Sequence, residues 1–283
     1  MTGSSLFLAT GLPDWLPSLE WVSLALALAI LVVCLRIYGR LLWGVLAGHG
    51  RVWVEPLGLP DLLAVIVLFT WLAGMAMVGF SRPDKIQSLT DSAIFQSAAL
   101  FGLVVGAIVL FLQARHIPVA QLFGFGREKP FWVLKKGAGL FLAVFPLVVF
   151  CGELVQMVVG KETQPQEIVK YFAQAAEHSD WWRLVLAAGL GVVVAPMTEE
   201  FIFRGYFYGV LRRYLGVIPG LLLTSLLFAS IHTNLSVLLP LFVLASCLTL
   251  AYEATGSLWV PMVMHGLFNA VMLGAMFYSA THP

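Results

Sequence analysis

The stretch Pro196-Met197-Thr198-Glu199-Glu200-Phe201-Ile202-Phe203-Arg204-Gly205 places two adjacent carboxylates and a guanidinium in strongly apolar surroundings. It follows the apolar run 184–195 and precedes the aromatic pair Phe207 and Tyr208. An ion in hydrocarbon loses its hydration, so charges in such surroundings need partners or a function. The stretch therefore predicts a membrane-embedded helix with a charged site inside it.

The composition agrees with a membrane location. Of the 283 residues, 60% are hydrophobic and only 11% are charged, whereas about a quarter of a soluble domain is charged. The basic residues are scattered over short connections, so we expect no nucleic-acid partner. The three cysteines lie in apolar segments, where we expect free thiols and no disulfide: Cys34, Cys151 and Cys247.

The apolar segments predict an all-α, polytopic membrane helical bundle with about eight spans, since each span takes about 20 residues. We expect spans at 19–42, 62–80, 92–113, 131–160, from Trp181 onward with a kink or break at Pro196, and at 217–233, 235–254 and 258–278. Residues 161–180 suit an amphipathic segment at the interface. We expect one integral membrane domain, with residues 1–130 forming N-terminal helices without a readable motif and 131–283 forming the core.

The distribution of Lys and Arg predicts the orientation, because positive charge accumulates in cytoplasmic connections. With the N-terminus outside, eleven of the 16 Lys and Arg residues fall inside and five outside. The outside residues are Arg82, Lys85, Lys161, Lys170 and Arg183. We therefore expect a multi-pass protein of a prokaryotic inner membrane, with the Glu199 region toward the cytoplasmic face.

The spacing of Glu200 and Arg204 predicts an ion pair on one helix face, because residues four apart are neighbours and the acid comes first. Glu199 lies about 100° around the helix from Glu200. We interpret Glu200 as the partner that neutralises Arg204, which leaves Glu199 free to accept a proton. Two other charged positions are expected to be structural: Glu253 to snorkel or pair locally, and Arg212 to anchor the topology.

Two later segments add groups that suit attack of water on an amide. Phe228 precedes His232 by one helical turn, near the end of the sixth span. His265 precedes Asn269 by the same spacing on the eighth, so both lie on one face. An imidazole and a carboxamide can donate hydrogen bonds to a carbonyl oxygen as it becomes tetrahedral. A base, a second imidazole and two donors would thus come from three helices.

These three motifs, with 255–261 (Thr-Gly-Ser-Leu-Trp-Val-Pro) before the last, resemble the CPBP family. Its members are the CAAX-protease and bacteriocin-processing membrane proteins related to the Rce1 prenyl endopeptidase, also called the Abi family. The resemblance covers roughly the last hundred residues. It implies that Glu199 and His232 activate water and that His265 and Asn269 form the oxyanion hole. Glu200, Arg204 and Phe228 would support the site.

The resemblance leaves the question of a metal open, because the family has also been described as metalloproteases. Glu199, His232 and His265 would then be the ligands. No His-Glu-x-x-His motif is present, and a glutamate committed to Arg204 is a poor ligand. We therefore favour a mechanism without a cofactor, acting on a membrane-tethered peptide of the lipidated, CAAX-type class.

Two other functions remain open at this point. A non-catalytic membrane scaffold or immunity protein would keep the same motifs as structure, since His and Asn often form hydrogen bonds between membrane helices. A proton-coupled transporter would also place ionisable groups within the bilayer. It would spread carboxylates through the depth of the membrane, whereas these acids cluster at one level.

Overall fold

The computed structural model describes residues 19–81, 90–159 and 167–282, and these ranges contain helices and no strand. Seven helices in them are long and apolar enough to cross a membrane. They are α1 (Leu19–Gly44) with η1 (Val45–His49), α2 (Leu59–Ser81), α3 (Asp91–Ala114), α5 (Pro130–Val159), the run from Trp181 to Leu215, α11 (Leu235–Thr255) and α12 (Trp259–Thr281). The shorter apolar helix α10 (Val217–Ser230) is the eighth of the expected segments. The predicted all-α membrane bundle is confirmed.

The run from Trp181 to Leu215 is a chain of short helical segments. It comprises α7 (Trp181–Ala188), η3 (Gly189–Val194), α8 (Ala195–Glu200), η4 (Phe201–Phe207) and α9 (Tyr208–Leu215), of which η3 and η4 are π-helical. Of the expected kink or break at Pro196, the break is absent, because helical dihedral angles continue on both sides of it. Pro196 lies in the first turn of α8, directly after a wide π turn. A π turn changes which carbonyl faces the proline ring, so the usual clash with the preceding turn is avoided.

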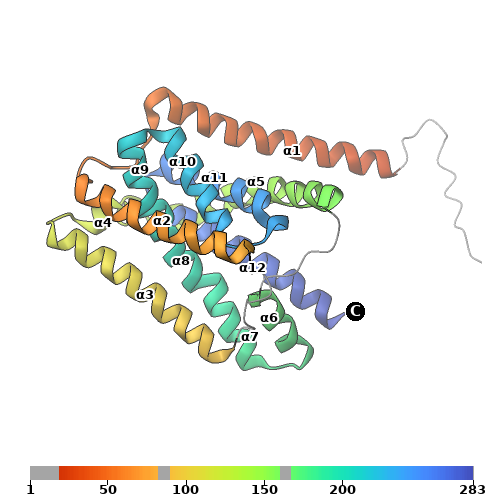
Figure 1. The fold of residues 1–283 in the computed structure, drawn as a ribbon. Coiled ribbons are helices and arrows are strands. Elements are labelled where there is room, and N and C mark those ends of the chain that lie inside the picture. The colour runs from red at the N-terminus through yellow and green to blue at the C-terminus, as the bar shows by residue number, and fades with distance from the viewer. Residues whose placement is uncertain (1–18, 82–89, 160–166, 283) are drawn as a thin grey trace, which may run out of the picture.

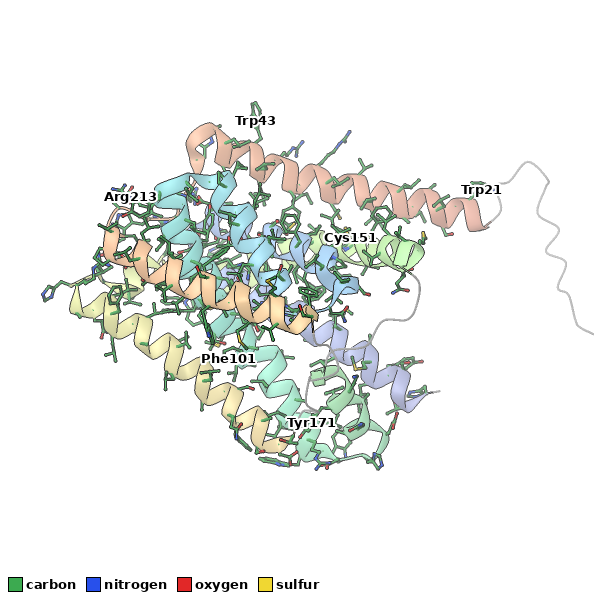
Figure 2. The ribbon with its side chains drawn as sticks, viewed as in Figure 1. Trp21, Trp43, Phe101, Cys151, Tyr171 and Arg213 are labelled. Atoms are coloured by element: carbon green, nitrogen blue, oxygen red, sulfur yellow. The ribbon has the colours of Figure 1, made fainter. Side chains whose placement is uncertain are left out.

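The core of the bundle lies where α10, α11 and α12 pack on this run, and α5 packs on α11 and α12. Phe207, Tyr208, Phe228 and Leu248 are fully buried there. The helices α1, α2 and α3 lie at the periphery and expose large apolar side chains (Figures 1 and 2). Apolar surface on this scale is stable only in a lipid environment, so the bilayer acts as the solvent of these helices.

The two ends of the bundle differ in their connections. Figure 1 shows α4 (Val119–Leu122), α9 and the connection from α1 to α2 at one end. Toward the other end lie α6 (Glu167–Glu177), α7 and the C-terminus. Helix α6 falls within the expected amphipathic segment and packs against α7 and α12. Residues 1–18, together with Arg82, Lys85 and Lys161 of the charge count, lie outside the described residues.

One cation in that count is buried within the bundle and does not lie near the membrane surface. Arg204 lies inside η4 with 1% of its side chain exposed and an ion pair to Glu200. Without Arg204, eleven inside cations become ten, against the same five outside. The excess of cations on the side expected to be cytoplasmic therefore remains.

Two buried polar clusters connect the run from Trp181 to Leu215 to the rest of the bundle. Asp61, fully buried on α2, pairs with Arg115 and accepts a hydrogen bond of 3.3 Å from the Tyr206 hydroxyl. The second cluster centres on Glu253 of α11, which pairs with Arg212 and accepts a 2.6 Å hydrogen bond from Tyr208.

Glu253 is fully buried, and its cationic partner is 41 positions earlier in the chain. The expectation that it snorkels or pairs locally is therefore wrong. Arg212 also donates a 2.8 Å hydrogen bond to the carbonyl of Val52, so it is a structural cation rather than a free anchor. Both clusters attach to the helix that carries the Glu199-Glu200 pair and hold it against α2 and α11.

Candidate active site

The two glutamates occupy a short α-helical segment between two π-helical ones. Glu199 and Glu200 end α8, and Arg204 follows in η4. π-helical turns are uncommon and are frequent at functional sites, because they redirect side chains that a regular helix would point elsewhere. The local irregularity of this run thus coincides with its charged residues.

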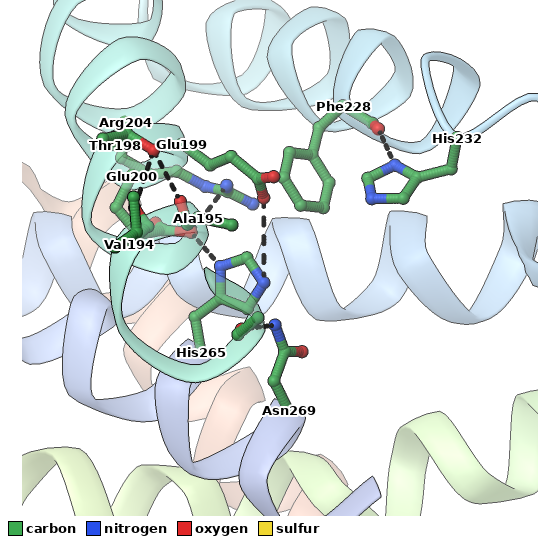
Figure 3. Close-up of polar contacts among 11 residues, drawn as sticks. Val194, Ala195, Thr198, Glu199, Glu200, Arg204, Phe228, His232, His265 and Asn269 are labelled. Atoms are coloured by element: carbon green, nitrogen blue, oxygen red, sulfur yellow. Dashed lines mark hydrogen bonds and ion pairs between the residues drawn. The ribbon is translucent and has the colours of Figure 1, made fainter. Parts of the chain in front are cut away.

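Glu200 is the centre of a buried contact set. Its Oε1 lies 2.8 Å from Nη1 of Arg204 and 2.9 Å from Nδ1 of His265 (Figure 3). The guanidinium of Arg204 also lies over the Phe228 ring, 4.4 Å from its centroid. Glu200 and Arg204 are almost completely buried, and His265 is 4% exposed. The ion pair between Glu200 and Arg204 that the sequence predicted is present. Its carboxylate also contacts His265, which the spacing within one helix could not reveal.

This arrangement fixes the orientation of His265. A carboxylate oxygen only accepts hydrogen bonds, so Nδ1 carries the proton that points to Glu200. The other ring nitrogen, Nε2, lies 3.9 Å from Oε2 of Glu199. Nε2 can therefore accept a proton in the neutral ring, and it donates a hydrogen bond when the ring carries a second proton. His265 links the two glutamates from opposite edges of its ring.

Glu199 differs from Glu200 in its surroundings. Its side chain keeps 16% exposure, whereas that of Glu200 has none. Among the residues that the structure describes, the closest polar approach to its carboxylate is that of His265 Nε2, at 3.9 Å. Of the two adjacent acids, Glu199 is therefore the one that keeps exposed surface for a further contact.

His232 lies in the turn after α10, outside the spanning helices. Its Nδ1 is 2.8 Å from the carbonyl oxygen of Phe228, and a carbonyl cannot donate, so Nδ1 carries the proton. Nε2 of the neutral ring is then the proton acceptor. Burial lowers the pKa of His232 from its usual value, against the opposing effect of the Glu199 carboxylate. The imidazole is thus neutral near pH 7.

The ring of Phe228 brings the three motifs together. Its centroid lies 5.0 Å from that of His232 and 5.8 Å from that of His265, and Arg204 lies over its face. The negative face of an aromatic ring attracts a cation, while its edges accept contacts from other rings. The side chain expected only to support the site therefore contacts all three of its charged or titratable neighbours.

Asn269 lies one turn after His265 on α12. Its Nδ2 donates a 2.7 Å hydrogen bond to the carbonyl of Gly191 in η3. One amide N–H remains for another acceptor, because a carboxamide has two. Between these residues Gly266 contacts the same π turn so closely that an added Cβ would lie 2.8 Å from the Val192 carbonyl oxygen. The packing of α12 on η3 thus sets the positions of His265 and Asn269.

The donor set does not fit a metal site. Within the described ranges, no three His, Cys, Asp or Glu side chains gather closely enough to hold a metal ion. Glu199, His232 and His265, the ligands that a metal would require, do not form such a group. Glu200 is already engaged by Arg204 and His265.

The contribution made by η3 was missed in the reading of the sequence. Gly191 accepts the hydrogen bond from Asn269, and Val192 limits the approach of α12. The pair Gly189 and Gly191, two residues apart in an apolar span, is the signal that was available. Glycine within a helix marks a bend or a close approach of another backbone.

Comparisons with known proteins point to the same region. The family model described as type II CAAX prenyl endopeptidase Rce1-like matches residues 181–271. An uncharacterised 24.3 kDa protein of Escherichia coli is 37% identical over 90 residues, which are 30% of this chain and 41% of that protein. A Bacillus subtilis (strain 168) protein named YdiL, described as a candidate membrane peptidase, is 25% identical over 190 residues, 65% of this chain and 74% of YdiL.

No solved structure gives a significant match. The chain thus spans less than half of the E. coli relative and about three quarters of YdiL. The matched region contains the two glutamates, Arg204, Phe228, both histidines and Asn269. The chain is an integral membrane protein, and its residues 181–271 match the Rce1-like family model.

Proposed function

We propose that this protein is an intramembrane endopeptidase that hydrolyses a peptide bond with water activated by Glu199 and His232. One observation carries the proposal: Glu200 is occupied by Arg204 and His265, while Glu199 beside it is not. A carboxylate with open space, next to an imidazole, is what a general base requires. The Rce1-like match and the peptidase description of YdiL support the same reaction class.

The proposed reaction gives each residue a role. Glu199 takes a proton from water as the water oxygen bonds to the carbonyl carbon of the substrate. His232, neutral with its Nε2 lone pair free, holds the same water by accepting a hydrogen bond from its other O–H group. The carbonyl oxygen becomes an oxyanion, which Asn269 and protonated His265 stabilise by donating hydrogen bonds. The C–N bond then breaks, and the leaving nitrogen receives the proton that Glu199 had taken.

The proposed substrate is a peptide segment held in or at the membrane. Glu199 is 18 residues after Trp181 and 16 residues before Leu215, near the middle of the run that contains it. A substrate must therefore enter the membrane region to reach it, which a lipidated or membrane-tethered peptide does at low cost. The family match supports a prenylated, CAAX-type substrate as the first class to try.

The orientation belongs to the same proposal. The end of the bundle formed by the α1–α2 connection, α4 and α9 carries most of the basic residues, which favours a cytoplasmic position. The N-terminus would then be outside, and substrate would approach from the cytoplasmic leaflet. Cysteines introduced at Gly126 and His178, in connections at opposite ends, test this: only a cysteine at position 178 should react with an impermeant reagent added to intact cells.

The activity itself is tested with purified protein in liposomes that contain fluorescent peptides. Peptides with a farnesyl group or a transmembrane anchor are compared with the same sequences in soluble form. We expect cleavage of the tethered peptides by the wild type and loss of cleavage in both Glu199→Gln and His232→Ala. Cleavage at the wild-type rate in both variants would overturn the proposal.

A further inference from the structure

Two adjoining cavities lie at the same end of the bundle as α4 and α9. The larger, of about 880 Å³, is bordered by the loop after η1 and by the connection from α4 to α5. The smaller, of about 440 Å³, reaches the last turns of α1. Both are lined by Gly50 and Arg51, so they adjoin, and together they are here called the α1 recess. Its size suits a small organic ligand.

The lining of the α1 recess is strongly basic. Arg51 and Arg127 line the larger cavity, and Arg40 and His49 line the smaller one. The acidic residue of the lining is Glu55. In the described part of the chain, neither Arg40 nor Arg51 contacts an acidic side chain. Two guanidinium groups without acidic partners therefore line the same recess. Because a guanidinium can donate two parallel hydrogen bonds to a phosphate, such a recess suits a phosphate group.

Hydrogen bonds from neighbouring segments hold the backbone around Arg51 in place. Arg127 donates hydrogen bonds to the carbonyls of Arg51 and Gly256. The amide of Arg51 donates a 2.8 Å bond to the carbonyl of Glu253. These contacts anchor the loop to the end of α11, so that Arg51 projects from a fixed backbone. A fixed backbone lowers the entropy lost on binding.

The position of the α1 recess identifies the kind of ligand. The smaller cavity is lined by Leu41 and Val45 beside Arg40, at the point where the spanning helix α1 ends. Trp43, 75% exposed, projects outward from the same turn (Figure 2). Exposed tryptophan at the end of a span marks the level of the lipid headgroups. Apolar walls next to paired arginines at this level match a lipid whose acyl chains lie along α1.

We propose that the α1 recess binds the phosphate-bearing headgroup of an anionic phospholipid. Arg51 and Arg40 hold the phosphodiester, while the chains of the lipid follow the exposed face of α1. The site is separate from Glu199 and His232 and does not depend on the proposed peptidase activity. Basic residues at a cytoplasmic interface face the leaflet in which anionic lipids are enriched.

The experiment is native mass spectrometry of the full-length protein in detergent, titrated with phosphatidylglycerol or phosphatidylcholine. We expect the wild type to bind phosphatidylglycerol more tightly than phosphatidylcholine. Each arginine near the membrane surface contributes about fivefold in affinity, so Arg40→Gln with Arg51→Gln should weaken phosphatidylglycerol binding about 30-fold. Arg213→Gln, which removes an exposed cation that lines neither cavity, should bind like the wild type.

Three results would overturn the proposal. They are equal binding of the two lipids by the wild type, unchanged phosphatidylglycerol binding in the double variant, and displacement of the lipid by an equal concentration of inorganic phosphate. The last result would indicate a site for free anions. If the double variant does not fold, Arg51→Gln and Arg51→Lys are compared instead. The lysine variant keeps the charge and should retain most of the affinity that the glutamine variant loses.

Discussion

Glu200 and His265, 65 positions apart in the chain, are joined by a 2.9 Å contact between Oε1 and Nδ1, and the same oxygen receives Arg204 at 2.8 Å. One carboxylate oxygen thus connects the charged motif of η4 to the histidine motif of α12. Because Nδ1 of His265 is committed to Glu200, its Nε2 is directed toward Glu199. Glu200 therefore positions the imidazole as well as neutralising the arginine.

Replacing Glu200 should reduce both stability and activity. Glu200→Gln leaves Arg204 buried without a counter-charge, a change that costs about 3–5 kcal/mol in other buried pairs. Thermal unfolding in detergent measures the loss. Glu128→Gln is the matched control, because Glu128 pairs with the partly exposed Lys136 at 2.6 Å, and surface pairs contribute less than about 1 kcal/mol. Equal melting temperatures for the wild type and Glu200→Gln would show that the pair is not important for stability.

The close packing of α12 on η3 can be tested with two glycines of the same helix. In Gly266→Ala the new Cβ would lie 2.8 Å from the Val192 carbonyl oxygen, so α12 and η3 must move apart, which changes the contact that positions His265 and Asn269. We expect a loss of peptide cleavage of at least about tenfold and a lower melting temperature. Gly274→Ala meets nothing within 4 Å and should be neutral or stabilising by up to about 1 kcal/mol. A fully active Gly266→Ala would contradict the proposed geometry.

The pH profile of cleavage should report on His232. Burial lowers the pKa of this imidazole, so the ring is neutral, and able to accept a hydrogen bond from water, at neutral pH. As the pH falls through this depressed pKa the ring gains a proton, and kcat/KM should fall with it. The acid limb should therefore lie below the usual histidine pKa of about 6.5. This assignment would be excluded if the midpoint of the acid limb lay at or above about pH 6.5. It would also be excluded if the same acid limb persisted in the residual activity of His232→Gln.

The buried hydrogen bond from Tyr208 to Glu253 should contribute measurably to folding. Tyr208→Phe removes the 2.6 Å bond to a fully buried carboxylate, and bonds to charged groups contribute about 1.5–3 kcal/mol. We expect a lower melting temperature for Tyr208→Phe. Tyr214→Phe changes a 42% exposed tyrosine of the same helix and should have little effect. If the two variants melted alike, the Glu253 cluster would not stabilise the run from Trp181 to Leu215.

The spans could be predicted because each is a local property of the sequence. A helix in hydrocarbon must satisfy its own backbone groups and needs an apolar surface, so its length and composition are enough to reveal it. The Glu200–Arg204 pair was predictable for the same reason, since four residues of helix bring the two side chains together. The structure agrees with the sequence on these points to within a few residues.

What could not be predicted depends on contacts between distant segments. Glu253 pairs with Arg212 of another helix, and Asp61 pairs with Arg115, so no spacing within one helix reveals them. The π turn before Pro196 lies where α12 packs on η3, a contact between segments that are far apart in the sequence. The contact of His265 with Glu200 is likewise a product of the fold.

The most direct test of the proposed function is the cleavage rate of a membrane-tethered peptide by the wild type and Glu199→Gln in liposomes, with melting temperatures measured in parallel. The substitution removes the proton acceptor and keeps the shape of the side chain. We predict a rate lower by at least about 10²-fold, as expected for loss of a general base, with a melting temperature close to that of the wild type, because Glu199 is outside the Glu200–Arg204 pair. Cleavage by Glu199→Gln at the wild-type rate would contradict the account.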